Sequence, residues 1–241
     1  MARMGKKYQQ KRLSAPKSYK IHRKEAPWTI KMMPGAHKTT NATALGVILR
    51  DILHLADNRF EAEYIAKNGN IIIDGKVRRD IRAPVGLFDM LEIPKIGKKY
   101  RIIFDKKARI IPKEIAKDSA QVKLVKITSK RVIRSGKIQL GTHDGRNIVL
   151  PADEGRKYKV GDSVKIKLPE QNREAVYPYE QGALAYILKG KHAGSMGTIE
   201  QIVPGSISKD PEAIINIEGQ VFPIVKENII IVGKDKPEIE L

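Results

Sequence analysis

The sequence predicts an α+β protein made of several small domains, in which short β-strands outnumber helices. Three observations favour this class. Helical periodicity is confined to residues 43–69, short apolar runs separated by glycine turns follow it, and 241 residues exceed the usual length of one domain. The expected organisation is a basic N-terminal extension (1–41), a helix–helix–hairpin domain (42–105), a central β-barrel-like domain (106–172) and a small C-terminal β-barrel (173–241).

The N-terminal extension has no apolar periodicity, and three prolines interrupt any long helix. Aromatic side chains are interleaved with its lysines and arginines at Tyr8, Tyr19 and Trp28. One interpretation is a disordered, solvated tail. The favoured interpretation is an extension that folds along RNA, in which cations hold phosphates and an aromatic ring stacks on a base.

Residues 41–69 predict two helices. The first is amphipathic, because apolar residues recur at helical spacing at Ala44, Leu45, Ile48, Leu49, Ile52 and Leu53. For the second helix, Asn58 is the expected N-cap, with Glu61 as its capping-box partner, and Gly69 is the expected end.

A small sheet with a basic hairpin is expected next. Ile71–Ile73 is a short β-run, and the following Asp74-Gly75 pair is a strong hairpin-turn signal. The residues after the turn, 76–79, are Lys-Val-Arg-Arg. Pro84 and Gly86 are interpreted as another turn before a final strand at 89–93.

The central domain is predicted to be β. Tyr100–Phe104 and Arg109–Ile111 flank a plausible hairpin turn at 105–107. In residues 121–134 apolar and basic side chains alternate imperfectly, which predicts a bulge near Thr128-Ser129. The basic side chains of this strand are expected on one exposed face of the sheet. Turns are expected at 135–136, 144–145 and 161–162.

The C-terminal domain is expected to hold a glycine-spaced loop between two strands, over residues 182–202. Gly190, Gly194 and Gly197 are interpreted as positions of positive φ or close backbone approach. Further strands at 213–217, 220–225 and 229–232 would complete a small barrel.

The net charge of +19 indicates a polyanionic partner. Residues 1–40 and 106–172 each carry a net charge of +10, residues 41–105 carry +2, and residues 173–241 carry −3. Nucleic acid is the first candidate and an anionic membrane surface the second. The membrane is the weaker alternative, because no basic amphipathic helix is visible in the N-terminal extension and no apolar stretch approaches the length of a membrane helix.

The motifs offer no catalytic constellation, so no enzymatic activity, metal or cofactor is expected. The chain has no cysteine, which removes thiolate zinc sites, disulfides and cysteine nucleophiles. Its five histidines form no spaced metal pair, and the Gly190-Lys191 pair fails the P-loop spacing. A basic N-terminus without the apolar core of a signal peptide favours a cytoplasmic protein.

Several motifs in a fixed order carry a family resemblance. GNIIIDGKVRRD (69–80) resembles the S-four-type RNA-binding domain, and 182–202 resembles a KOW motif. Between them lies Thr142-His143-Asp144-Gly145-Arg146, and before them lie Ala15-Pro16-Lys17 and Pro34–Lys38. This order is similar to the S-four-e family of archaeal and eukaryotic small-subunit ribosomal proteins, and the end of the chain looks archaeal.

The resemblance implies a non-catalytic component of the small ribosomal subunit, in the cytoplasm. Its partners would be small-subunit ribosomal RNA and neighbouring ribosomal proteins, without a membrane and without homo-oligomers. The residues expected to contact RNA are Arg3, Lys6, Lys7, Lys11, Arg12, Lys17, Lys20, Arg23, Lys38, Arg50, Lys76, Arg78, Arg79, Arg82, Lys130, Arg131, Arg134, Arg146, Lys191 and His192. The acidic C-terminal domain leaves open whether it binds RNA or protein.

Two other function classes stay open at this point. A pseudouridine synthase could use the same RNA-binding domain, but the residues after 105 look too short for its catalytic domain. A transcription or translation factor could use the KOW motif. Co-sedimentation would distinguish it, because a constitutive subunit stays with small subunits through a high-salt wash and a factor does not.

Overall fold

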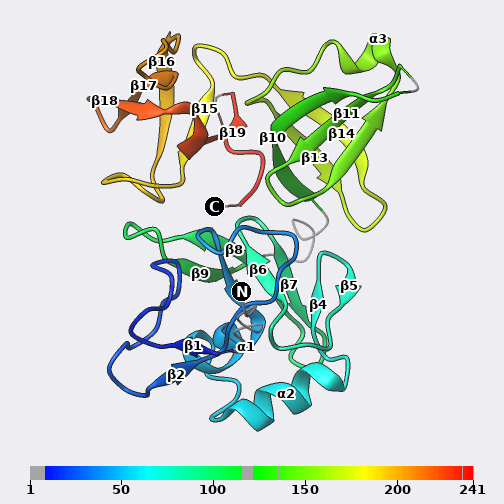
Figure 1. Ribbon diagram of the computed structural model, residues 1–241, viewed down its shortest axis with the longest axis vertical. Helices are drawn as coiled ribbons and strands as arrows, with labels where there is room; N and C mark the ends of the chain where they lie inside the picture. Colours follow the sequence, from blue (N-terminus) through cyan, green and yellow to red (C-terminus); the bar gives the residue numbers. More distant parts are fainter. Residues whose placement is uncertain (1–8, 116–121, 135, 235, 241) are drawn as a thin grey trace, which may run out of the picture. The chain divides into compact units, whose positions relative to one another are not determined.

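The computed structural model describes residues 9–115, 122–134, 136–234 and 236–240. The chain divides into two compact units (Figure 1). The first contains the chain up to Ile102 together with Arg109–Glu114, and the second contains Ile103–Ala108 and the chain from Ile115 onward. The described residues are mostly β with a few short helices. The α+β class is therefore confirmed in outline, whereas the four-domain division stays a prediction.

The first helix is shorter and more deeply buried than its periodicity predicts. Strand β3 (Ala42–Ala44) leads into α1 (Leu45–Val47), which continues as a π-helical turn, η1 (Ile48–Ile52). Residues 42–49 are all buried, so this segment has no polar face. Strand β6 (Pro84–Gly86) pairs with β3, and Pro84 is opposite Ala44. The expected helix start at Ala44 and the expected turn at Pro84 are therefore wrong, because the two positions pair in a sheet.

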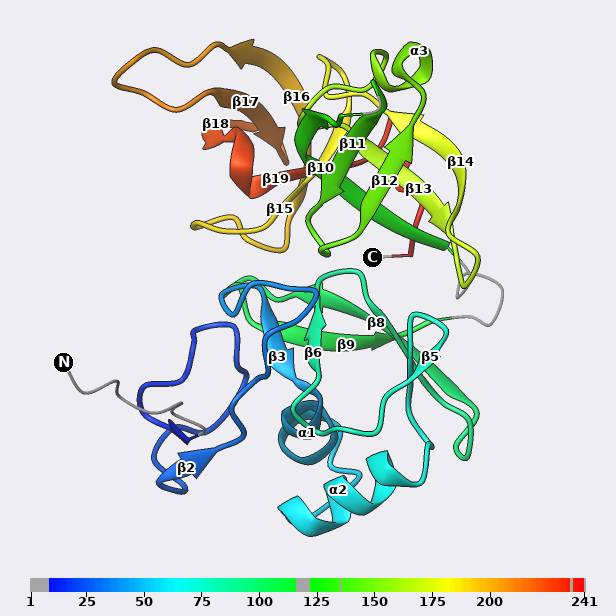
Figure 2. The same cartoon turned by 45° about the vertical axis from the view of Figure 1, so that its right-hand side comes forward.

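Helix α2 (Arg59–Lys67) has the predicted N-terminus (Figure 2). The side-chain oxygen of Asn58 accepts a hydrogen bond from the Glu61 amide at 3.0 Å. The Glu61 carboxylate accepts from the amide of Asp57 and the side-chain amide of Asn58. The reciprocal bond is thus displaced by one residue from a standard capping box. Gly69 follows the helix with φ of +74°, which glycine adopts without strain.

The main sheet of the first unit is antiparallel, in the order β5-β4-β7-β8-β9. Its strands are β4 (Ile72–Ile73), β5 (Lys76–Val77), β7 (Met90–Ile93), β8 (Lys98–Phe104) and β9 (Ile110–Glu114). Both predicted hairpins, at 74–75 and 105–107, lie between neighbouring strands of this sheet. The N-terminal segment adds a separate two-stranded sheet of β1 (Gln10–Lys11) and β2 (Trp28–Thr29).

The second unit contains two five-stranded antiparallel sheets. The first has the order β12-β11-β10-β13-β14, and α3 (Ala152–Gly155) follows β12. Its strands are β10 (Val122–Val132), β11 (Ile138–Thr142), β12 (Asn147–Leu150), β13 (Ser163–Lys167) and β14 (Asn172–Tyr177). The pairing of β10 with β11 shifts register between Ile127 and Ser129, which confirms the predicted bulge.

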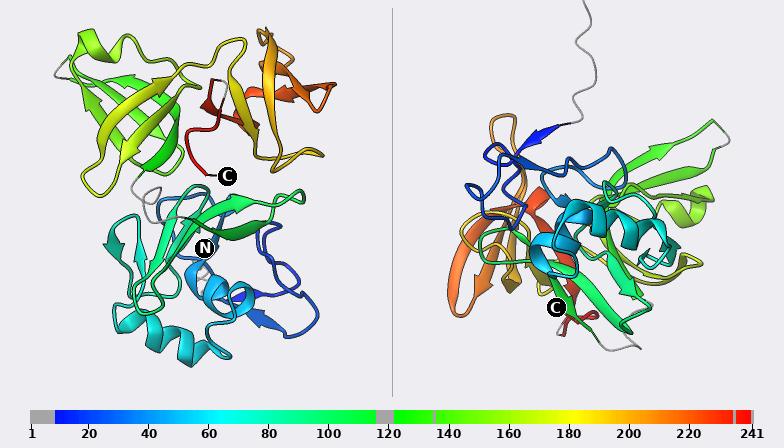
Figure 3. Two further views of the ribbon diagram at one scale, coloured as in Figure 1. Left: turned by 180° about the vertical axis from the view of Figure 1, so that it is seen from behind. Right: turned by 90° about the horizontal axis from the view of Figure 1, so that it is seen from below.

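The C-terminal sheet of this unit, coloured yellow to red in Figure 3, has the strand order β18-β17-β16-β15-β19. Its strands are β15 (Leu184–Ile187), β16 (Met196–Val203), β17 (Glu212–Ile217), β18 (Gln220–Val225) and β19 (Ile229–Gly233), and the short helix η3 (Lys226–Asn228) precedes the last. In the loop between β15 and β16, Gly194 has φ of +77° and approaches the carbonyl of Phe104 so closely that a Cβ would lie 2.6 Å from its oxygen. Glycine is required there, as the spacing predicts.

Candidate nucleic-acid interface

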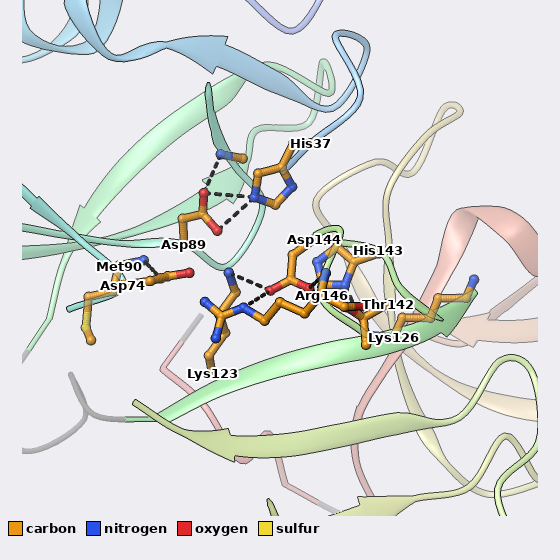
Figure 4. Close-up of polar contacts among 11 residues, drawn as sticks. His37, Asp74, Asp89, Met90, Lys123, Lys126, Thr142, His143, Asp144 and Arg146 are labelled. Atoms are coloured by element: carbon orange, nitrogen blue, oxygen red, sulfur yellow. Dashed lines mark hydrogen bonds and ion pairs between the residues drawn. The ribbon is translucent and has the colours of Figure 1, made fainter. Parts of the chain in front are cut away.

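The β4–β5 hairpin presents a rigid group of cations. Asp74 and Gly75 form its two-residue turn with φ of +51° and +76°. The Asp74 carboxylate accepts a hydrogen bond from the Met90 amide at 3.0 Å, which ties the turn to β7 (Figure 4). The exposed cations that follow this turn are Lys76, Arg78 and Arg79. The turn that precedes them is therefore tied to β7, while their side chains stay exposed to solvent.

Arg12 is an internal structural residue of the first unit. Its side chain is 4% exposed, and its guanidinium forms ion pairs with Asp51 at 2.8 Å and Glu25 at 3.0 Å. Its Nε also donates to the carbonyl of His22 at 2.7 Å. The sequence predicts an RNA contact for the guanidinium at this position. The structure differs, because Asp51 in η1 binds the group and draws the N-terminal segment onto the helix.

Two further arginines of the expected site hold the local chain. The Arg23 guanidinium donates to carbonyl oxygens of Leu13 and Ala15, at 3.0 and 2.8 Å, and to that of Pro16. Arg50 pairs with Asp51 at 2.8 Å. These contacts shape residues 13–23 and support the Arg12 ion pair.

A buried histidine fixes the Pro34–Lys38 segment. The Nε2 atom of His37 lies 2.8 Å from both carboxylate oxygens of Asp89, and the side chains of both residues are buried (Figure 4). Asp89 also accepts from the Gly86 amide at 2.8 Å. The imidazole covers the Cα of Gly86, where a Cβ would collide with the ring. Lys38, directly after this anchor, stays exposed.

The remaining expected residues of the first unit fall into three groups. Lys11 and Lys17 are exposed, whereas Lys20 and Arg82 are partly buried. Arg82 approaches the carbonyl of Lys31 with its Nε at 3.4 Å. The predicted contacts at Arg3, Lys6 and Lys7 lie outside the described residues.

In the second unit, Asp144 is the centre of a buried ion cluster. Its carboxylate lies 3.1 Å from Lys123 Nζ and 2.8 Å from Arg146 Nε, and the Thr142 hydroxyl donates to it (Figure 4). Burial alone would raise the pKa of Asp144, but the charges of Lys123 and Arg146, the neighbouring His143 and the Thr142 hydrogen bond hold that pKa well below its usual range. The 142–146 motif thus has a structural role, and Arg146 is committed to it.

Lys126 joins the two sheets of the second unit. Its ammonium donates to the carbonyls of Lys226 and Ile229, each at 2.7 Å, and of Glu227 at 3.1 Å. Burial lowers the pKa of Lys126 to about 8, with the charge of Lys226 acting in the same direction. The expected exposed face of β10 is therefore wrong at Lys123 and Lys126, because the strand is buried on both faces from 123 to 127.

The far end of β10 does present cations. Arg131 and Arg134 are exposed, whereas the Lys130 ammonium donates to the carbonyls of Arg156 and Tyr158 at 3.1 and 2.8 Å. Lys130 therefore holds the segment after α3 as well as carrying a charge.

In the glycine loop between β15 and β16, only one of the two expected RNA-contacting residues is fully exposed. Lys191 is exposed, but the His192 ring stacks on Phe222 with centroids 3.9 Å apart. One face of the imidazole is therefore covered by β18.

The exposed cations among the described residues can attract anions, but the described residues do not form a group arranged for catalysis. Among them, no group of three His, Asp or Glu side chains is arranged to hold a metal ion. Within the described ranges, none of the helices has the length and apolar character that crossing a bilayer requires. The arrangement instead offers exposed cations on short, braced β-hairpins and strand ends.

The residues that sequence reasoning missed are the internal partners: Asp51 for Arg12, Asp89 for His37, and the 226–229 carbonyls for Lys126. Only one signal in the sequence bears on Lys126. It stands between apolar residues at 124, 125 and 127, a run that indicates a strand buried on both faces.

Comparisons with known proteins agree along the whole chain. Residues 4–40 match the RS4NT domain, and residues 96–173 match the family described as Ribosomal family S4e. The small ribosomal subunit protein eS4 of Methanocaldococcus jannaschii is 42% identical, and the alignment covers both chains completely. The protein of the same name from Archaeoglobus fulgidus is 44% identical over 96% of this chain and 97% of the relative.

A solved structure shows the same architecture. The crystal structure of the 30S ribosomal protein S4e from Thermoplasma acidophilum superposes with a TM-score of 0.70 at 29% identity. It covers 81% of this chain and 96% of that chain. With relatives above 40% identity over nearly their full length, this chain belongs to the ribosomal protein family S4e.

Proposed function

We propose that this chain is a structural constituent of the small ribosomal subunit that binds folded ribosomal RNA through its phosphates and shape, without catalysis. The observation that carries the proposal is its full-length similarity to archaeal proteins named small ribosomal subunit protein eS4. On this proposal the chain acts in the cytoplasm as part of the ribosome and does not form homo-oligomers.

The basic side chains fall into an internal group and an exposed group, and this division supports the proposed mode of binding. Cations that meet carboxylates or carbonyls, such as Arg12, Arg23 and Lys126, are internal to their units. Other exposed cations stand on or directly after β-strands, at the β4–β5 hairpin and at the end of β10. Such groups can replace condensed counterions along a folded RNA without a large ordering cost.

The C-terminal residues 173–241 are proposed to contact neighbouring ribosomal proteins. Their net charge is −3, which disfavours a phosphate surface. Apolar side chains are exposed there at Ile207, in the long β16–β17 connection, and at Val221 in β18. Their assignment as a KOW-type domain, and the four-domain organisation as a whole, belong to the same proposal.

The test is the salt dependence of RNA binding by the full chain. If about eight counterions are released, the logarithm of the affinity for a folded small-subunit RNA fragment falls with the logarithm of the salt concentration at a slope of about −6 to −7. A flat dependence contradicts the electrostatic mode. Sedimentation after a high-salt wash tests the structural role, because a constitutive subunit stays with the small subunit and an exchanging factor does not.

A further inference from the structure

Trp28 lies on the outer face of the β1–β2 hairpin, directly opposite Lys11. The antiparallel register pairs Lys11 with Trp28 and Gln10 with Thr29. Residues directly opposite in such a pair project from the same face with Cβ atoms about 5 Å apart. Trp28 is 48% exposed, and Lys11 is exposed beside it. An indole ring and an ammonium group therefore form the outer surface of this hairpin, and no described element covers either side chain completely.

The hairpin that carries this pair is fastened to the interior of the first unit. The Arg12 amide donates to the carbonyl of Pro27 at 2.9 Å, directly between the two strands. The guanidinium of the same residue is bound by Asp51 in η1. Trp28 is thus held next to a residue whose side chain is anchored in the core. Because the backbone that carries Trp28 is held in this way, only its side chain has to be ordered when it contacts a ligand.

The charge around Trp28 favours an anionic occupant. The only carboxylate in residues 9–41 is Glu25, and it forms an ion pair with Arg12. Lys11 and Lys24 are exposed in the same segment. Helix α2 offers a contrast, since its exposed Phe60 and Tyr64 stand among two basic and two acidic residues. Of these exposed aromatics, only Trp28 stands in a segment whose lysines and arginines outnumber its carboxylates.

Tyrosines do not provide an equivalent surface in the described part of this segment. Tyr19 is 2% exposed, so its ring is closed to a ligand. The structure therefore separates the interleaved aromatics into one that packs inside the unit and one that faces outward.

From this juxtaposition we propose that Trp28 stacks on an unpaired base of the RNA while Lys11 contacts a neighbouring phosphate. The inference rests on the proposed function and specifies its ligand. The face of a base is accessible only where the base is unstacked, so the RNA contacted here has a bulge, loop or end rather than a continuous helix. A ring stack does not read the base edge, so the contact tolerates any base.

Trp28 is the single tryptophan of the chain, so tryptophan fluorescence reports directly on this residue. The experiment titrates the full-length protein with an RNA duplex carrying one bulged adenosine and with the same duplex lacking the bulge. We expect saturable quenching of Trp28 fluorescence by the bulged RNA and little by the continuous duplex. In a parallel filter-binding assay, Trp28→Leu should weaken binding of the bulged RNA about 5- to 150-fold, as loss of one base stack does.

Matched variants separate stacking from general effects. Trp28→Phe keeps an aromatic ring and should retain most of the affinity that Trp28→Leu loses. Phe60→Leu removes an exposed ring from α2, 81% exposed against 48% for Trp28, and should leave bulge binding unchanged. Equal losses in Trp28→Leu and Trp28→Phe, or no quenching with unchanged Trp28→Leu affinity, overturn the stacking inference.

The two proposals fail in different ways. Salt-dependent binding of both RNAs without any effect at Trp28 overturns this inference and leaves the proposed function standing. Absence of salt-dependent binding to either RNA contradicts both.

Discussion

Lys123 and Asp144 form an ion pair of 3.1 Å in which each side chain is only 1% exposed. Removing one partner leaves the other charge buried, which is strongly destabilising. Arg146 still balances Asp144, so we expect Lys123→Met to lower the free energy of unfolding by about 3 kcal/mol, the lower end of the usual range. Urea denaturation measures this change. Lys137→Met removes an exposed lysine just before β11 and controls for the loss of one positive charge. If Lys123→Met lowered the free energy of unfolding by less than about 1 kcal/mol, the structural role of the Lys123–Asp144 pair would be contradicted.

Asp144 should also make the second unit sensitive to acid. Its pKa in the folded protein lies below the value of about 3.9 for an unfolded aspartate. The stabilisation is therefore present above pH 4 and is lost as the pH falls toward the folded pKa. The wild type is expected to lose stability relative to Asp144→Asn as the pH falls from about 5 to 2. A difference that does not change over this range would show that Asp144 does not titrate differently on folding.

Local chemistry explains which parts of this fold could be predicted. The Asp74-Gly75 turn, the Asn58 cap and the bulge at Thr128 depend on neighbouring residues, and all three occur where the sequence predicts them. Gly194 was recognisable for the same reason, because its spacing within one loop indicates a special backbone position.

The remaining features depend on partners far along the chain. Arg12 meets Asp51, 39 residues away, and Lys126 meets carbonyls about 100 residues away. The sequence shows that both residues are cations. It does not show whether each charge faces solvent or binds an acceptor that is distant in the sequence and buried in the fold. The pairing of Ala44 with Pro84 is equally remote, and it replaces a helix start and a turn by two strands.

Lys126 should make stability rise with pH in the alkaline range. Its pKa of about 8 in the folded protein is below the value of about 10.4 for an unfolded lysine. Between these values the unfolded chain binds more protons, so increasing pH favours the folded state. The unfolding free energy of the wild type is expected to rise relative to Lys126→Met between pH 8 and 10. If the difference stays constant or falls, the three carbonyl hydrogen bonds to the ammonium outweigh its burial.

Arg12 should be required for the fold of the first unit. We expect Arg12→Leu to lower the free energy of unfolding by about 3 kcal/mol, because Asp51 then keeps only Arg50 as an ion-pair partner. Hydrogen exchange should accelerate both in residues 9–41 and in η1. The neighbouring Lys11→Ala, at an exposed side chain, should change stability by less than about 0.5 kcal/mol. Acceleration confined to residues 9–41 would indicate a loosely attached extension, as the sequence alone suggests.

The β4–β5 hairpin should contribute a definite share of the slope of log affinity against log salt concentration for RNA binding. Arg78 and Arg79 are exposed on a hairpin that Asp74 fixes to β7, so each can hold a phosphate at a set position. Each phosphate contact contributes about −0.9 to the slope of log affinity against log salt on a duplex. Replacing both arginines by glutamine should therefore make the slope shallower by about 1.8 and weaken binding similarly for RNAs of different sequence.

A matched pair controls for the loss of two charges anywhere on the chain. Lys234 and Lys236 are exposed near the acidic C-terminal sheet, and their replacement by glutamine should leave the slope unchanged. An equal change in slope for the two double variants would mean that net charge alone, and not the position of the hairpin, determines the affinity. A hairpin variant that weakens binding at every salt concentration without changing the slope would mean that Arg78 and Arg79 contact something other than phosphate.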